Sequence, residues 1–93
     1  MNKLNVLKNG QALFRCPGCG LIHAISILPG RWSWDQDPYH PTITPSILVK
    51  QSLWNAPTII CHSFITGGNI QFLTDSTHAL AGRTVELPDY EIT

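Results

Sequence analysis

The feature that most constrains this chain is a pair of cysteines, Cys16 and Cys19, separated by Pro-Gly and followed by Gly20. Proline and glycine at these positions permit a tight turn in which two thiolates face one point. The residues on both sides are strand-like, with QALFR at 11–15 before the pair and the apolar run LIHAISIL at 21–28 after it. We therefore predict a hairpin with a zinc-knuckle turn at its tip.

The cysteine count favours a metal site over a disulfide. The chain has three cysteines in 93 residues, and an odd number with two in C-x-x-C spacing does not fit a disulfide framework. A thioredoxin-type redox pair is also disfavoured, because such a pair opens a helix, whereas here a strand follows. The thiols are therefore expected to bind a metal ion.

The remaining ligands must come from a distant segment, where the candidates are the adjacent Cys61 and His62, and His78. Adjacent residues of a strand point to opposite faces, so Cys61 and His62 cannot both bind one ion unless a bulge intervenes. Zinc takes thiolates and neutral imidazoles in a tetrahedral arrangement, and thiolate chemistry favours Cys61. We predict a Zn²⁺ site formed by Cys16, Cys19, Cys61 and His78.

The other histidines leave two interpretations open. His62 would then point away from the metal, and His23 would share a strand face with Ile25, so each is expected to be a buried histidine paired with a backbone carbonyl. Alternatively, His23, His62 and His78 could surround a catalytic metal that keeps one position open for water. Asp75 is the carboxylate best placed to serve that metalloenzyme as a general base.

The rest of the pattern predicts one mainly β (small α+β) domain over residues 1–93, built from antiparallel strands. Asp75 or Ser76 is expected to cap one short helical turn over 77–81, which Gly82 would end. Besides the hairpin at the cysteines, strands are expected at 46–54, 58–65, 70–74 and 84–88.

The segment 29–46 contains four of the seven prolines and two of the three tryptophans, Trp32 and Trp34. Such a composition predicts an ordered loop without regular structure. Its aromatic residues suit either contact with a protein partner or packing over a small core.

Charge and hydropathy exclude some classes of function. Six basic residues balance six acidic ones, so the chain lacks the basic surface that nucleic acids require. The low charged fraction of 13% and the apolar fraction of 43% favour contact with other proteins, including a homodimer. No apolar run is long enough for a signal peptide or a membrane span, so we predict a cytoplasmic protein.

Three sequence blocks, FRCPGCGLIHAI, PTITPSILV and CHSFITGGNIQFLTDSTHALAGRTVELPD, together resemble a family of small proteins of phages and prophages. The family is catalogued as a domain of unknown function, and the resemblance extends from Phe14 to Asp89. Some members carry an ammonia monooxygenase label, but that enzyme is a membrane copper complex and no segment here spans a bilayer. The resemblance implies a phage-type accessory protein that binds and modulates a host component, such as a defence system. Together with the cysteines, it leads to the hypothesis of a protein-binding domain with a structural metal; the alternative is a small hydrolase-like metalloenzyme.

Overall fold

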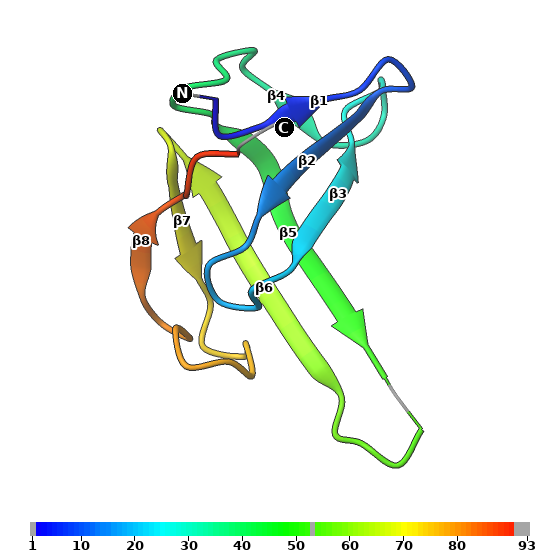
Figure 1. The fold of residues 1–93 in the computed structure, drawn as a ribbon, viewed down its shortest axis with the longest axis vertical. Helices are drawn as coiled ribbons and strands as arrows, with labels where there is room; N and C mark the ends of the chain where they lie inside the picture. The colour runs from blue at the N-terminus through cyan, green and yellow to red at the C-terminus, as the bar shows by residue number, and fades with distance from the viewer. Residues whose placement is uncertain (1, 53, 91–93) are drawn as a thin grey trace.

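The computed structural model describes residues 2–52 and 54–90, and this part of the chain is almost entirely β (Figure 1). Its strands form two antiparallel sheets, with the orders β1-β2-β3 and β4-β5-β6-β7-β8. The strands are β1 (Asn5–Val6), β2 (Gln11–Arg15), β3 (Ile22–Ser26), β4 (Ser33–Trp34), β5 (Ile43–Gln51), β6 (Ile59–Thr66), β7 (Asn69–Phe72) and β8 (Thr84–Glu86). In the described part of the chain, no helix is long and apolar enough to cross a membrane.

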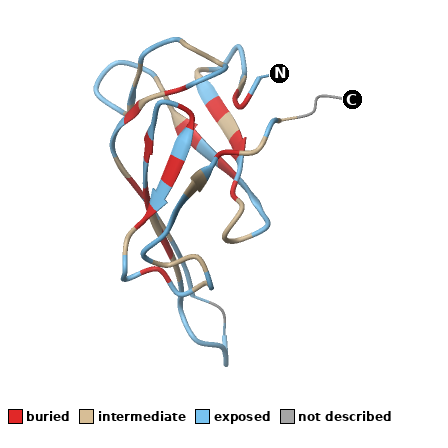
Figure 2. Ribbon diagram, turned by 90° about the vertical axis from the view of Figure 1, so that its left-hand side faces the viewer, coloured by how far each residue is buried: buried red, intermediate tan, exposed pale blue. Residues whose placement is uncertain are grey.

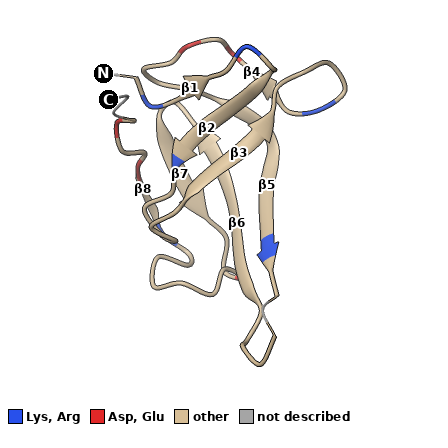
Figure 3. Ribbon diagram, turned by 45° about the vertical axis from the view of Figure 1, so that its right-hand side comes forward, with Lys and Arg blue, Asp and Glu red and all other residues tan. Residues whose placement is uncertain are grey.

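The three-stranded sheet packs across one face of the five-stranded sheet (Figures 1 and 3). Burial alternates along the strands (Figure 2), because successive side chains of a strand point to opposite faces. Phe14 of β2, Ile47 of β5 and Phe72 of β7 are fully buried in one shared core. Each long strand of the larger sheet therefore has an inner face toward the core and an outer face toward solvent.

The mainly β class is confirmed, but the expected helical turn is wrong: the described residues contain no helix. Backbone hydrogen bonds attach the segment after β7 to its neighbours β6 and β7. The Thr77 amide donates to the carbonyl of Ile60 at 2.9 Å, and the Gly82 amide donates to the carbonyl of Phe72 at 3.0 Å. Ser76, a predicted helix cap, instead uses its hydroxyl to bond the backbone of His62.

The proline-rich segment 29–46 contains more regular structure than its composition predicts. It holds β4 and the first residues of β5, which begins at Ile43 and ends at Gln51; Leu53, inside the strand predicted at 46–54, lies outside the described residues. Pro45 fits within β5 because the pairing with β6 shifts register between Ile43 and Ile47. Proline has no amide hydrogen to donate to a neighbouring strand, and a residue at such an irregularity does not need one.

The loop between β4 and β5 is held by aspartate side chains. Oδ1 of Asp37 accepts hydrogen bonds from the amides of Tyr39, at 2.9 Å, and His40, at 3.1 Å. Both hydrogen bonds stabilise the ionised carboxylate and so lower the pKa of Asp37, and the bond from His40 has the larger effect. The indole N–H of Trp34 donates to the carbonyl of Asp37 at 3.3 Å, and its ring packs against the core. The loop is therefore ordered, with Trp34 half-buried rather than displayed to solvent.

Candidate functional site

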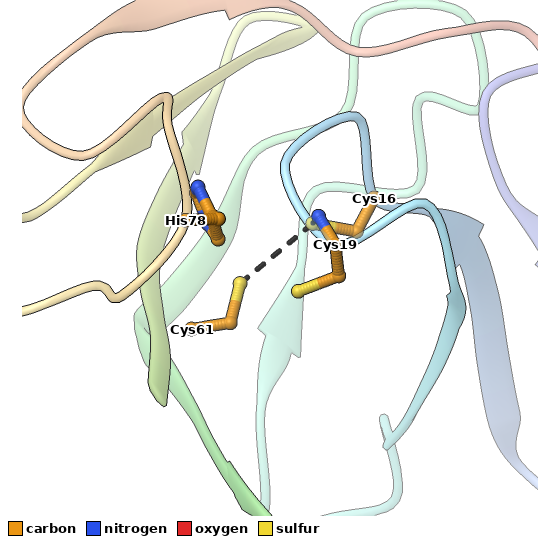
Figure 4. Close-up of side chains that lie close together, drawn as sticks. All are labelled: Cys16, Cys19, Cys61 and His78. Carbon is orange, nitrogen blue, oxygen red and sulfur yellow. Dashed lines mark hydrogen bonds between the residues drawn. The ribbon is translucent and has the colours of Figure 1, made fainter. Parts of the chain in front are cut away.

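Three thiols and one imidazole meet between the two sheets (Figure 4). Cys16 and Cys19 lie in the turn between β2 and β3, Cys61 points inward from β6, and His78 lies in the segment after β7. Their ligand atoms all lie within 4.8 Å of one another. The Sγ atoms of Cys16 and Cys61 are 3.6 Å apart, close to the roughly 3.8 Å that tetrahedral zinc with about 2.3 Å bonds to sulfur requires. The predicted residues therefore form a group that could hold a metal ion.

The turn between β2 and β3 fixes the first two thiols. The amide of Cys16 donates to the carbonyl of Leu21 at 2.8 Å, and the amide of Gly20 donates to the carbonyl of Cys16 at 2.9 Å. Gly20 has φ of +71°, which glycine adopts without steric cost. The amide of Cys19 approaches the sulfur of Cys16 at 3.4 Å. The sequence thus builds a rigid turn in which backbone donors face a thiolate.

Gly18 and Phe72 shape the space that His78 occupies. A Cβ atom at Gly18 would lie 2.3 Å from Cε1 of the His78 ring, so only glycine allows the imidazole to approach this turn. The ring meets Phe72 edge-on, with 4.4 Å between ring centroids. Its Nδ1 accepts the Leu80 amide at 3.2 Å, while its buried Nε2 has no hydrogen-bond partner among the described residues. An unpartnered buried nitrogen beside three thiols fits a metal ligand.

The protonation of the thiols also fits a cation site. The hydrogen bond from the Cys61 thiol lowers the pKa of Cys16 to about 3 against the opposing effect of burial, with a smaller contribution from His23. The same hydrogen bond raises the pKa of Cys61, and burial raises the pKa of Cys19. One thiolate is therefore stable in this pocket, and ionising all three requires a positive charge among them.

A second group of polar side chains lies on the opposite face of β6. Nε2 of His62 is 3.1 Å from Oγ of Ser46, and Nδ1 of His62 is 3.0 Å from Oδ2 of Asp75. The three side chains thus form a continuous chain of hydrogen bonds from hydroxyl to imidazole to carboxylate. This is the arrangement of a Ser-His-Asp catalytic triad, which is recognised by geometry and not by the order of its residues in the chain.

Strand pairing places the hydroxyl beside the imidazole. His62 is paired with Leu48 across β5 and β6, so Ser46 is its diagonal neighbour on the same face. The bulge between Ile43 and Ile47 lies at this point of β5, and bulges re-aim side chains near active sites. The register of β5 on β6, with its shift between Ile43 and Ile47, thus leaves Ser46 beside His62 on one face of the sheet.

The segment after β7 places the carboxylate on the other side of His62. The amide of Leu73 donates to the carbonyl of His62 at 2.8 Å. The Ser76 hydroxyl accepts from the amide of His62 at 3.0 Å and donates to its carbonyl at 3.2 Å. Asp75, between these two anchors, is thereby held against the imidazole.

The two remaining expectations about histidines have different outcomes. His23 is buried as predicted and meets Phe14 edge-on, with 5.4 Å between ring centroids, but its Nε2 has no hydrogen-bond partner in the described part of the chain. His62 is not a buried histidine paired with a backbone carbonyl: its side chain is 23% exposed and bonds two side chains. Nor do His23, His62 and His78 form a group that could share an ion within the described residues.

Ser46 is the site residue that the sequence patterns did not reveal. No G-x-S-x-G turn surrounds it, and it follows Thr-Pro in a segment expected to be irregular. The only available signal was that Ser46, Leu48 and His62 would share a face if β5 and β6 paired in this register.

The comparison with protein families gives a match to a described family. The model of a family described as bacterial ubiquitination-like system serine protease (BubE) matches residues 2–73, a range that includes Ser46 and His62. No curated protein and no solved structure matches the chain. The predicted kinship to a family of small phage and prophage proteins is thus confirmed only as membership of a small bacterial domain family, and the match gives no support for a phage origin. The match covers most of the 93 residues, and the chain belongs to this BubE family.

Proposed function

We propose that the chain is a serine protease of a bacterial ubiquitination-like system, with Ser46 as nucleophile, His62 as general base and Asp75 as the carboxylate that orients His62. The observation that carries this proposal is the pair of hydrogen bonds on either side of one imidazole, 3.1 Å to Ser46 and 3.0 Å to Asp75. The description of the family supports the same class of activity.

The proposed reaction begins with attack of Ser46 Oγ on the carbonyl carbon of the scissile amide. Nε2 of His62 takes the hydroxyl proton, while the Asp75 carboxylate accepts the Nδ1–H bond and stabilises the imidazolium. His62 then gives this proton to the leaving amine, and the acyl group stays on Ser46. Water attacks the acyl carbon as His62 takes its proton. Return of that proton to Ser46 releases the carboxylic acid and restores the site.

The exposure of the triad fits a protein substrate. The side chains of His62 and Asp75 are 23% and 54% exposed, so the site is open on the outer face of the sheet. A chain that protrudes from a folded protein can reach such a surface. The protein partner expected from the composition is, in this proposal, the substrate.

We further assign the four interior ligands to a structural Zn²⁺. Cys16, Cys19, Cys61 and His78 supply the complete tetrahedral set of a structural site, which leaves no position for a catalytic water. Bound zinc would supply folding free energy. Two ligands lie close in sequence to triad members, since Cys61 precedes His62 and His78 follows Asp75 by three positions. Metal binding would therefore anchor the segments that carry the base and its carboxylate.

Labelling with a fluorescent fluorophosphonate tests the proposed nucleophile, because this reagent phosphonylates activated serines. The wild-type protein should be labelled, and the Ser46→Ala variant should not. Ser52→Ala is the matched control, since Ser52 is an exposed serine that contacts Thr58 and not His62. Equal labelling of the wild-type and Ser46→Ala proteins would show that Ser46 is not the reactive residue.

A further inference from the structure

A surface pocket of about 250 Å³ lies next to the residue that carries the nucleophile. Gly30, Arg31, Trp32 and Pro45 line it. Pro45 directly precedes Ser46, and the indole N–H of Trp32 donates to the carbonyl of Ser46 at 3.2 Å. Two walls of the pocket are therefore fixed to the backbone of Ser46. This attachment to Ser46 makes the pocket a candidate for binding a substrate group that neighbours the scissile bond.

The lining residues define the chemistry of that group. Trp32 and Pro45 supply apolar walls, and Arg31 is the one charged residue of the lining. Arg31 is exposed, and no ion pair of its guanidinium occurs within residues 2–52 and 54–90. The loop between β3 and β4 has a basic position and no acidic one (Figure 3). An unpaired guanidinium beside apolar walls suits a carboxylate, which it can bind through two parallel hydrogen bonds.

We propose that this pocket is a specificity subsite that binds a carboxylate of the substrate polypeptide close to the scissile bond. The inference rests on the proposed serine protease function and identifies Arg31 as a specificity residue. The carboxylate belongs either to an acidic side chain or to the C-terminus of the substrate. Lys50, a cation of β5, is not part of the pocket lining and provides a matched comparison.

A library of short internally quenched peptides tests the subsite. The wild-type protein should cleave a peptide with glutamate at one position near the scissile bond about tenfold faster, in kcat/KM, than the same peptide with glutamine. Arg31→Gln should abolish this preference. Arg31→Glu should instead cleave a peptide with lysine at that position faster than the glutamate peptide. Lys50→Gln should retain the wild-type ratio. Paired peptides ending in a free acid or an amide distinguish a terminal carboxylate from a side-chain carboxylate.

The outcomes separate the subsite from the nucleophile. Fluorophosphonate labelling of Ser46 does not depend on a peptide, so Arg31→Gln should still be labelled like the wild-type protein. Intact labelling with no carboxylate preference in the wild-type protein, or with an unchanged preference in Arg31→Gln, would overturn the subsite and leave the protease function standing. Absence of labelling in the wild-type protein would overturn both.

Discussion

Replacing Ser46 with alanine should lower kcat for peptide hydrolysis by roughly 10⁴–10⁶-fold, and His62→Ala should lower it by a similar factor. The hydroxyl and the imidazole act in one step, because His62 removes the proton as Ser46 attacks. Loss of either residue therefore removes the same contribution, and the double variant Ser46→Ala/His62→Ala should be no slower than either single variant. Steady-state kinetics on the library peptide that is cleaved fastest measures all three.

Two further variants define what these losses mean. Asp75→Asn should lower kcat by roughly 10⁴-fold, because the amide can hold the imidazole in the wrong tautomer. Ser52→Ala should leave kcat unchanged. Losses that simply multiply in the double variant would mean that Ser46 and His62 act independently, which a triad does not allow.

Removing the metal should unfold the domain. An apparent zinc-binding free energy on the order of 10 kcal/mol is comparable with the entire stability of a small domain, about 5–15 kcal/mol. The metal-free protein should therefore lose its near-ultraviolet circular dichroism and its cooperative thermal transition. It should also lose fluorophosphonate labelling, because His62 and Asp75 lie on segments that the ligands hold. Adding Zn²⁺ back should restore all three properties.

Histidine variants separate the two sites. His78→Ala should lose metal and stability together, whereas His62→Ala should keep the metal and the fold but lose hydrolysis. His40→Ala, which removes an imidazole whose side chain is 71% exposed, should change neither. A metal-stripped protein that keeps both its melting temperature and its labelling would contradict the structural role of the metal.

The residues of the candidate metal site were predictable from local rules. The Cys16 to Cys19 spacing with its internal Pro-Gly predicts the turn, and the alternation of strand side chains separates Cys61 from His62. Both rules act over neighbouring residues, so they hold without knowledge of how the strands pair. His78 was expected as the fourth ligand, because it lies in the short segment that follows the next strand after Cys61. These four residues meet as expected, with all ligand atoms within 4.8 Å of one another.

The triad was not predictable from such rules, because its members meet only through long-range pairing. Ser46 approaches His62 through the register of β5 on β6, which includes a bulge at a proline, and sequence periodicity does not specify a register with a bulge. Asp75 approaches His62 because the segment after β7, which carries Asp75, forms hydrogen bonds with the backbone of His62 in β6. Local propensity predicted a helical turn there, and tertiary hydrogen bonds overrode it.

Identifying the atom that carries the acyl group tests the central claim most directly. The protein can be mixed with p-nitrophenyl acetate, quenched in acid after the first turnover, digested and sequenced by tandem mass spectrometry. We expect one acetyl group on Ser46, which is absent from His62→Ala treated in the same way. An acetyl group on a cysteine, whether Cys16, Cys19 or Cys61, would contradict serine catalysis, as would an acetylated Ser46 that forms equally well without His62.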